Sequence, residues 1–278
     1  MTSSQPVNLK SLSIRLSTDG LSFCVYAPAE AQPYIYKEYK VSPIISMAAN
    51  LKEALQTEEL LKQEYQRVNV LISTPEFTTV PALAFQREDV NDVFRFVFPK
   101  SGQQHVSYNV LRRAGIAIIF GLDKHIHQLL LDDFPRARFY ASASTLIEFF
   151  SERSLIGANK KMYVYLHDEE MALYCFDQGR MLFVNTYAVR GVNDCQYYIL
   201  NVWKQMGMEQ IDDALCIVDD GDLSNQLADK IRYFIKNVSL IDRTEDVFRT
   251  HLGTDLQGVT KSANLIPYDL QTLLVCGY

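Results

Sequence analysis

Carboxylates that could hold a metal ion are concentrated at residues 219–222, an Asp-Asp-Gly-Asp run that closely follows Asp212 and Asp213. Aspartate oxygens are the ligands that a hard cation such as Mg²⁺ or Ca²⁺ prefers. The run is shorter than an EF-hand loop and lacks the terminal glutamate of that loop. Asp222 also suits the first position of a helix, where a carboxylate caps backbone N–H groups and complements the helix dipole. We therefore expect a solvated turn and a helix cap here, and we predict no metal site.

Two histidines, His125 and His127, lie close together in the sequence. On an α-helix, residues two positions apart point in directions that differ by about 200°, so these imidazoles would not face one metal ion. Asp123, Asp132 and Asp133 nearby could shift the pKa of either histidine. We expect both side chains to lie on the surface.

The sequence contains no pattern typical of a catalytic nucleophile or of a phosphate loop. It has no G-x-S-x-G elbow, no P-loop and no G-x-G-x-x-G turn. Cys216 falls within an apolar, strand-like segment, which suits a core thiol better than an exposed thiolate. No catalytic residue is predicted.

Arginines cluster at two places, Arg112-Arg113 and Arg136-Ala137-Arg138. Aromatic residues follow the second pair, and such a mixture can contact RNA. Two pairs do not make a basic face, and 27 basic against 33 acidic side chains leave a formal net charge of −6. Neutralising many phosphates is therefore not expected, and direct nucleic-acid binding is not predicted.

The elements that must position these residues begin with a hairpin. Two strand-like runs, residues 12–18 and 21–27, flank Asp19-Gly20, and an Asp-Gly pair between such runs is a strong hairpin signal. A third strand over 33–41 and an amphipathic helix over 46–65, with Ser46 as its N-cap, follow. A buried strand over 68–72 completes a βββαβ order.

The next region is harder to interpret. Residues 80–98 mix proline, acidic residues and phenylalanines, and we predict that they are mostly helical, as part of an insertion around 80–112. Strands over 106–112 and 115–120, a helix capped by Asp123, a strand over 138–141 and a helix over 144–153 are expected after residue 98. Gly157-Ala158-Asn159 then breaks the pattern, so we place a lobe boundary after residue 157.

The same order returns in the second half of the chain. Strands are expected over 161–166, 170–176, 180–187, 214–218 and 238–241, with a helix over 192–206 and another that starts at Asp222 and includes Phe234 and Ile235. An offset of 150 residues aligns the apolar positions of the first hairpin, 12–25, with those of 162–175. The sequence thus predicts two copies of one unit, residues 1–157 and 158–278.

Composition restricts the class of protein. The 278 residues are 48% hydrophobic and 22% charged, with 12 Gly and 9 Pro, which excludes disordered and collagen-like chains. Five scattered cysteines are typical of free thiols in a reducing compartment. The longest apolar run, residues 114–122, has nine residues, too few to cross a bilayer, and the first residues lack signal-peptide features. We predict a cytoplasmic protein without a membrane segment.

A duplicated βββαβαβα unit resembles the actin-like ATPase superfamily, in which two ribonuclease-H-like lobes enclose a nucleotide. More closely, the start of the chain, Leu12-Ser13-Ile14-Arg15-Leu16-Ser17-Thr18-Asp19-Gly20, and the overall length resemble an uncharacterised bacterial family with that fold. The resemblance implies an α/β fold with mixed sheets and two such lobes. It also implies a candidate cleft lined by Ser17, Asp19, Gly20, His167 and Asp168.

In active members of the superfamily, the turn after the first strand of each lobe carries an acidic residue, a glycine and a small hydroxyl residue. Backbone N–H groups at such a turn cradle phosphate, and the carboxylate organises Mg²⁺ or water. Here Ser17 stands where the aspartate of the first lobe is expected, and the turn of the second lobe, His167-Asp168-Glu169-Glu170, has no glycine and three carboxylates. Like charge there would repel phosphate. A glycine pair for adenosine is replaced by the single Gly221 among aspartates.

These departures predict a fold retained without its ATPase chemistry. The main hypothesis is a non-catalytic protein that binds an unidentified protein partner and needs no cofactor. The alternative is a divergent nucleotide-binding ATPase or kinase-like enzyme that uses ATP and Mg²⁺ in the inter-lobe cleft. A third hypothesis is an accessory role in RNA processing through Arg112, Arg113, Arg136 and Arg138. The partner and the oligomeric state do not follow from the sequence.

Overall fold

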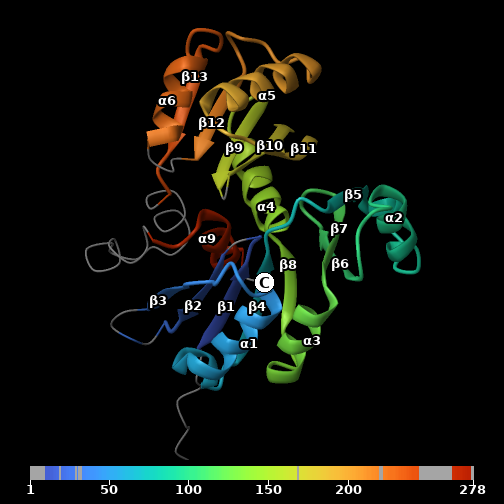
Figure 1. The fold of residues 1–278 in the computed structure, drawn as a ribbon. Helices are drawn as coiled ribbons and strands as arrows, with labels where there is room; N and C mark the ends of the chain where they lie inside the picture. The colour runs from blue at the N-terminus through green and yellow to red at the C-terminus, as the bar shows by residue number, and fades with distance from the viewer. Residues whose placement is uncertain are drawn as a thin grey trace, which may run out of the picture.

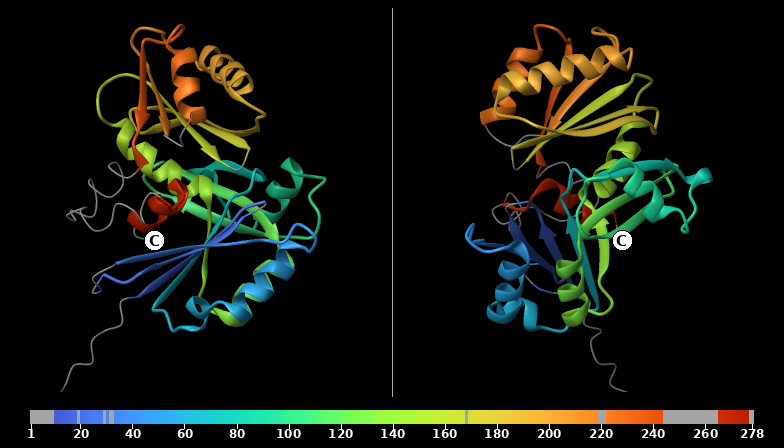
Figure 2. Two further views of the ribbon diagram at one scale, coloured as in Figure 1. Left: turned by 60° about the vertical axis from the view of Figure 1, so that its left-hand side comes forward. Right: turned by 45° about the vertical axis from the view of Figure 1, so that its right-hand side comes forward.

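A computed structural model of the chain describes residues 10–18, 20–28, 30, 33–167, 169–218, 222–243 and 265–276. Two five-stranded sheets form two lobes that lie one above the other, and a three-stranded sheet lies beside the first lobe (Figures 1 and 2). The chain has a mixed α/β fold of two ribonuclease-H-like lobes, as the sequence predicts.

The first sheet has the strand order β3-β2-β1-β4-β8. Its strands are β1 (Ser11–Leu16), β2 (Leu21–Tyr26), β3 (Tyr34–Tyr39), β4 (Arg67–Ile72) and β8 (Arg138–Ala141). The predicted hairpin is β1 and β2, which pair antiparallel, whereas β4 and β8 run parallel to β1. Helices α1 (Met47–Thr57) and α3 (Lys124–Asp133) lie on one face of this sheet and α9 (Tyr268–Val275) lies on the other (Figure 2).

The helix starts in the first lobe follow the predicted caps. The Ser46 hydroxyl accepts a hydrogen bond from the Ala49 N–H at 3.2 Å, and the Asp123 carboxylate accepts from His125 N–H at 2.8 Å and Ile126 N–H at 3.1 Å. The helix predicted over 46–65 is shorter than expected. It ends at Thr57, and a 3₁₀ turn, Glu59–Lys62, follows before β4.

The third sheet is formed by the region between β4 and β8, in the order β5-β7-β6. Its elements are β5 (Phe77–Pro81), a 3₁₀ turn (Ala82–Ala84), α2 (Val90–Val97), β6 (Gln104–Leu111) and β7 (Ile116–Asp123). The prediction of a mostly helical 80–98 was wrong at its start, because the β-branched Thr78, Thr79 and Val80 pair with β7 and only α2 is α-helical. Val90, Phe94 and Ile119 form a small separate core under this sheet.

The second sheet repeats the order of the first, as β11-β10-β9-β12-β13. Its strands are β9 (Lys161–His167), β10 (Glu170–Asp177), β11 (Arg180–Ala188), β12 (Ala214–Val218) and β13 (Asn237–Ile241), with helices α5 (Val192–Gln205) and α6 (Asp222–Ile231). The expected strands and α5 are confirmed. The expectation that the second of these helices includes Phe234 and Ile235 was wrong, because α6 ends at Ile231 and three turn residues follow.

The pairing register confirms the internal repeat. Ile14 of β1 lies opposite Phe23 of β2, and 150 positions further on Val164 of β9 lies opposite Leu173 of β10. A one-residue slip of either hairpin would turn its apolar face outward, so an equal register means an equal orientation of the two buried faces. The two lobes are therefore copies in topology and in register.

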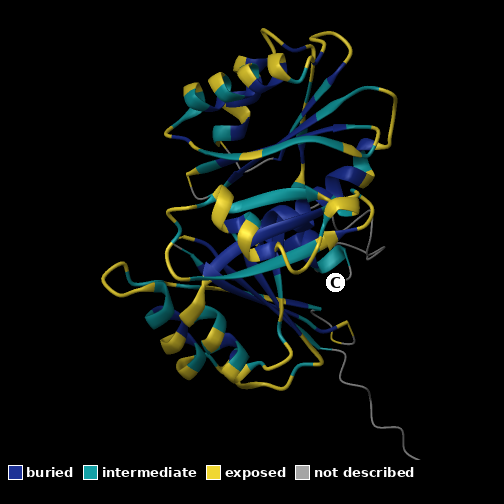
Figure 3. Cartoon of the chain, turned by 90° about the vertical axis from the view of Figure 1, so that its right-hand side faces the viewer, coloured by how far each residue is buried: buried dark blue, intermediate teal, exposed yellow. Residues whose placement is uncertain are grey.

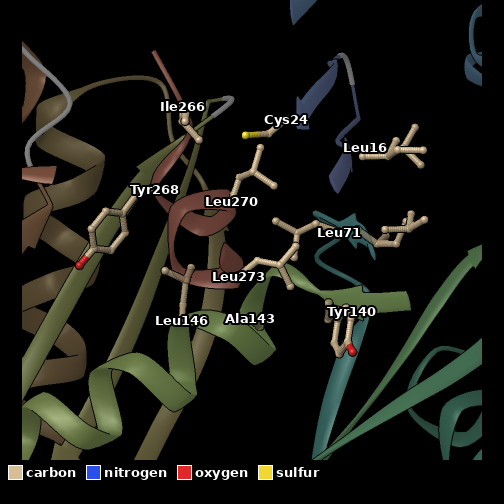
Figure 4. Close-up of a cluster of buried hydrophobic side chains, with 14 of the residues drawn as sticks. Leu16, Cys24, Leu71, Tyr140, Ala143, Leu146, Ile266, Tyr268, Leu270 and Leu273 are labelled. Carbon is tan, nitrogen blue, oxygen red and sulfur yellow. The ribbon is translucent and has the colours of Figure 1, made fainter. Parts of the chain in front are cut away.

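One buried core joins the two lobes. Helix α4 (Ser142–Ser154) leads from the first lobe into the second and packs against α9, and both helices lie between the sheets (Figures 1 and 4). The Phe150 ring of α4 stacks on Tyr163 of β9, with centroids 4.3 Å apart, and lies 5.4 Å from the Tyr174 ring of β10. The core cluster includes residues of both sheets. Aromatic packing thus fixes the second lobe onto α4.

Helices long and apolar enough to cross a bilayer do not occur among the residues that the structure describes.

Candidate functional site

The parallel strands of both sheets end near α9. Arg15, near the end of β1, reaches Asp269 of α9, and the Tyr165 ring, near the end of β9, lies 6.0 Å from the Tyr268 ring of α9. Ligands of open α/β sheets bind beyond the carboxyl ends of the strands. The candidate cleft therefore lies at these ends, where the sequence places its phosphate-loop residues.

The turn of the first lobe is closed on itself. Ser17 is buried, and its N–H donates to the Gly20 carbonyl at 2.9 Å while its hydroxyl lies 3.5 Å from the same oxygen. A Cβ at Gly20 would lie 2.7 Å from the Ser17 hydroxyl, so a side chain at this position would force that hydroxyl to rotate away. The N–H of Ser17 is thus used within the turn and does not point at a ligand. Asp19 lies outside the described residues.

The turn of the second lobe is shorter. His167 lies opposite Glu170, so only two residues connect β9 and β10, and Glu169 adopts a left-handed φ of 57°. The Glu169 carbonyl accepts a hydrogen bond from the Val189 N–H at 2.9 Å, and the His167 ring stacks 4.7 Å from the Tyr165 ring. Asp168 lies outside the described residues. A two-residue turn of this kind has too little backbone to surround a phosphate group.

A buried ion pair lies at the carboxyl end of the first sheet. The Arg15 Nε donates to both carboxylate oxygens of Asp269, at 3.0 and 2.9 Å. The Ser142 hydroxyl and the Leu270 N–H also donate to this carboxylate, each at 2.8 Å. Asp269 is fully buried and Arg15 nearly so. A carboxylate that accepts all these hydrogen bonds could bind Mg²⁺ only if several of them were broken.

Hydroxyl groups extend this network between α4 and α9. The Thr272 hydroxyl donates to the Asp269 carbonyl at 2.8 Å and lies 3.0 Å from the Thr145 hydroxyl. The Thr145 hydroxyl also lies 3.2 Å from the Asp269 carbonyl. Polar groups buried in this way rigidify a core when all of them have partners. The network therefore fixes α9 to the first lobe as well as to α4.

Apolar side chains close the corresponding end of the second sheet. Val218 at the end of β12 and Ile241 at the end of β13 are buried in the same core as Ile266 and Tyr268. Leu270 and Leu273 of this segment lie beside Cys24 and Leu71 of the first sheet in Figure 4. Residues 219–221, which include the expected adenosine glycine, lie outside the described residues.

The described residues contain no group of three or more His, Cys, Asp or Glu side chains that could hold a metal ion. Asp213 accepts hydrogen bonds from the Lys160 N–H at 2.8 Å and the Glu209 N–H at 2.7 Å, so its carboxylate fixes the loop before β12. Its role in this structure is that of a loop anchor.

All five cysteines are free thiols, and burial raises the pKa of each. The pKa of Cys24, Cys175 and Cys276 rises to about 12 and that of Cys195 to about 11. Because the thiolate is the nucleophile, such thiols are unreactive at neutral pH.

The histidine pair of α3 differs from expectation. His125 is exposed as predicted, but His127 is half-buried. Its ring stacks on His105 of β6 with centroids 3.6 Å apart, and the Phe139 ring lies tilted against it at 4.8 Å. Burial lowers the pKa of both His105 and His127. The pairing joins the third sheet to α3, and no local pattern could reveal it, because His105 lies 22 positions away.

The basic residues lie at separate elements. Arg112 and Arg113 form the turn between β6 and β7, and Arg113 makes an exposed ion pair with Glu152 of α4 at 2.8 Å. Arg136 precedes β8 and Arg138 begins it.

Sequence reasoning missed Arg15, Ser142 and Asp269. The available signal for Arg15 was its position as a charged residue inside an apolar strand. Its partner Asp269 lies 254 positions away, so no local pattern connects the two.

Comparison with known proteins identifies the family. The model of the family described as "Protein of unknown function (DUF3822)" matches residues 3–238, and the chain belongs to this family. A search of curated proteins finds no match.

Solved structures share the fold. The chain is similar to a Bacteroides thetaiotaomicron protein described as having an actin-like ATPase fold and unknown function, with 32% identity and a TM-score of 0.81 over 97% of this chain and 96% of that one. It is also similar to a chain of the PilM-PilN type IV pilus biogenesis complex, with 9% identity and a TM-score of 0.61 over 96% of this chain and 98% of that one. The chain has the actin-like ATPase fold.

Proposed function

We propose that this DUF3822 protein has retained the actin-like ATPase fold without its chemistry and acts by binding another protein. The observation that carries the proposal is the Asp269 carboxylate, which is fully buried at the carboxyl end of the first sheet and bonded to Arg15 and Ser142. A carboxylate engaged in this way is not available to Mg²⁺ or to an attacking water.

The two hairpin turns support the same proposal. The Ser17 N–H donates within its own turn, and the His167 turn has two residues and no glycine. ATPases of this fold need backbone N–H groups that converge on phosphate from both lobes. The Ser17 N–H is not available for this, because it donates to the Gly20 carbonyl.

The PilM-PilN complex supports a role in an assembly. That solved structure, which shares only the fold with this chain, contains a two-lobed protein of this kind within a complex for type IV pilus biogenesis. Proteins that share a fold can carry different binding sites. The likeness therefore indicates that this fold can take part in an assembly, and it does not identify the partner.

The proposal includes the layout and location of the chain. Residues 1–157 form the first lobe, with an insertion around 80–112, and 158–278 form the second, although α9 packs on the first sheet. Five free thiols support a cytoplasmic location, because such thiols persist in a reducing compartment.

The decisive experiment is a thermal-shift titration of the purified full chain with ATP or ADP and Mg²⁺, together with an ATP hydrolysis assay. A nucleotide at 100 times its Kd stabilises a protein by about 2.7 kcal/mol, which raises the unfolding temperature measurably. We expect no shift and no hydrolysis. Hydrolysis that is lost on changing Asp19 or Asp168 would overturn the proposal.

A nucleotide-binding ATPase is the second candidate function. The observation that favours it is the position of Ser17, Gly20 and His167 at the strand ends where this fold holds phosphate. Stabilisation by ATP and Mg²⁺ that a Ser17→Ala variant loses would support it.

A further inference from the structure

A hollow of about 420 Å³ lies between α2, the loop that follows it and the start of α3. Arg95 of α2, Gln104 at the start of β6 and Lys124 at the start of α3 all line it. Figure 3 looks onto this side of the molecule, where much of α2 and of the loop after it is exposed. The described residues that line the hollow include none of the candidate cleft and none of α9, so the two features are separate.

The charged side chains of the lining are both basic. They are Arg95 and Lys124, and neither forms an ion pair with a described residue. Acidic residues stand close by in the sequence but do not belong to the lining. The Asp123 carboxylate caps α3, where it accepts hydrogen bonds from two backbone N–H groups, and Asp92 is exposed one turn before Arg95. Two unpaired cations from separate elements favour a ligand with an acid group.

A side-chain amide in the lining has a free acceptor. The Nε2 of Gln104 donates to the Glu76 carboxylate, so Glu76 fixes which way the amide points. The Oε1 of Gln104 is buried and accepts no hydrogen bond from a described residue. A Cβ at Gly121 would come within 1.8 Å of this oxygen, so a side chain at that position would push the amide out of place. A buried acceptor in this state favours a ligand that carries an O–H or N–H donor.

The hydroxyl of Ser101, in the same lining, is also buried without a partner among the described residues. It can donate to an acid group or accept from a hydroxyl. Water, of which one molecule occupies about 30 Å³ in the liquid, can fill a hollow of this size. A ligand with hydroxyl groups can displace that water and replace its hydrogen bonds. The two free oxygens of this lining therefore favour a hydroxylated ligand.

Apolar side chains make up much of the rest of the lining. Phe94, Phe98, Pro99 and Val106 belong to it, and the Phe94 and Phe98 rings lie against each other with centroids 5.0 Å apart. Small-molecule sites combine such a wall with a few polar groups that fix the orientation of the ligand. The wall can cover the C–H groups of a short carbon chain, and the hollow is larger than an inorganic ion needs.

We propose that this hollow binds a small hydroxylated organic anion, in which an acid group lies next to hydroxyl groups on a short carbon chain. Arg95 and Lys124 hold the acid group, and Ser101 and Gln104 form hydrogen bonds with the hydroxyl groups. Carboxylate and phosphate both suit the two cations, so the shared chemistry is the acid group beside a hydroxyl. The inference goes beyond the proposed function and does not depend on it.

The test is isothermal titration calorimetry of the purified full chain with glycerol 3-phosphate and with glycerate. These acids share a hydroxylated three-carbon chain and differ in the acid group, so the one that binds more tightly identifies that group. Glycerol, which has only the hydroxyls, and inorganic phosphate and acetate, which have only the charge, are the controls. We expect one of the two acids to bind with a Kd below about 1 mM and the three controls to bind at least about tenfold more weakly.

A matched pair of variants locates the binding. Lys124→Met keeps the length of the side chain and removes its charge. Lys100→Met is the control, because Lys100 is exposed on the neighbouring loop and is not part of the lining. We expect Lys124→Met to weaken the acid that binds by about tenfold and Lys100→Met to change its Kd by less than about twofold. Ser101→Ala removes one of the free oxygens and should also weaken this acid severalfold.

Three outcomes would overturn the inference. The first is that neither acid binds more tightly than glycerol, inorganic phosphate and acetate. The second is an equal loss in Lys124→Met and Lys100→Met, which would mean that general surface charge attracts the anion. The third is binding that Ser17→Ala abolishes and Lys124→Met leaves intact, because the anion would then lie in the cleft. Both lysines are exposed, so circular dichroism of their variants should match that of the native chain.

The outcomes are distinguishable from those of the nucleotide titration. If neither acid binds and ATP causes no shift, the non-catalytic function stands and the anion site falls. If the chain hydrolyses ATP while an acid binds in a manner that depends on Lys124, the proposed function falls and the anion site stands.

Discussion

The two lobes have one topology but bury opposite chemistry on their inner faces. In the first sheet, β1 turns Ser13 and Arg15 toward α9, and Arg15 meets Asp269 there. At the corresponding positions of the second sheet, 150 residues later, β9 turns Tyr163 and Tyr165 toward α4 and α9. One lobe is therefore closed by a buried ion pair and the other by stacked rings.

This difference shows how a duplicated unit can keep its fold while its inner faces diverge. Register and strand order are fixed by alternating apolar positions on the outer faces, which both hairpins share. The inner faces only need a filled, hydrogen-bonded interface with the two connecting helices. An interface made of polar groups is stable only when every hydrogen-bonding partner is present, whereas an interface made of aromatic rings depends mainly on the volume that the rings fill. The two lobes should therefore respond differently to substitution.

The largest effect is expected at the ion pair of the first lobe. Asp269→Ala leaves the Arg15 guanidinium buried without its carboxylate, and removing one partner of a buried pair costs about 3–5 kcal/mol. Urea unfolding of the variant and the native chain, followed by circular dichroism, measures the change.

The control replaces both partners. Arg15→Met with Asp269→Leu removes both charges and keeps most of the volume, and such exchanges are often neutral or stabilising. The double variant should therefore recover most of the stability lost in Asp269→Ala. A double variant that is less stable than the single one would show that the closure of the first lobe does not depend on paired charge.

A smaller effect is expected where polar contacts join the third sheet to β8. Asn109→Ala removes the amide that bonds Phe139, Ala141 and Ser144, and it leaves partly buried groups unpaired. We expect a loss of about 2 kcal/mol in the free energy of unfolding. Gln103→Ala, at an exposed amide just before β6, is the control and should change stability by less than about 0.5 kcal/mol. Equal effects of the two variants would contradict the role of Asn109.

Local patterns were enough to predict the described strands other than β5, both hairpins, the caps Ser46 and Asp123, and the repeat. These features depend on neighbours in the sequence, such as the Asp19-Gly20 pair between two apolar runs. Pairings over long separations were not predictable, and Arg15 with Asp269 and His105 with His127 are examples. The β5 strand was missed because Pro81 and the phenylalanines hide its short β-branched run. The assignment of Ser17 and His167 to a cleft stays a prediction.

The aromatic closure of the second lobe should tolerate substitution better. Phe150→Leu keeps an apolar side chain of similar size but loses the stack on Tyr163 and the contact with Tyr174. A cost of about 1.5 kcal/mol is expected. Trp203, the single tryptophan, is buried in the second lobe, so its fluorescence follows the unfolding of that lobe. Tyr163→Phe keeps the ring and should lower the free energy of unfolding by less than Phe150→Leu does. The reverse order would mean that the Tyr163 hydroxyl, and not the stacking of the rings, stabilises this contact.

The smallest effect concerns pH and should be confined to the first lobe and its third sheet. Burial lowers the pKa of His105 and His127. The charge of Lys124 lowers the pKa of His105 further, and the charge of His105 does the same for His127. A histidine with a lowered pKa takes up protons more readily in the unfolded chain, so its contribution to stability is complete above the unfolded value of about 6.5 and is lost as the pH falls below it.

Amide exchange in β6 should therefore speed up between pH 7 and 5, while Trp203 fluorescence stays constant. His127→Phe keeps a ring on His105 and removes one titrating group, and it should reduce this acceleration. An equal pH response in both lobes would mean that the acid-sensitive contacts are not those of the histidine pair, because the phenylalanine and tyrosine rings that close the second lobe carry no titrating charge in this range.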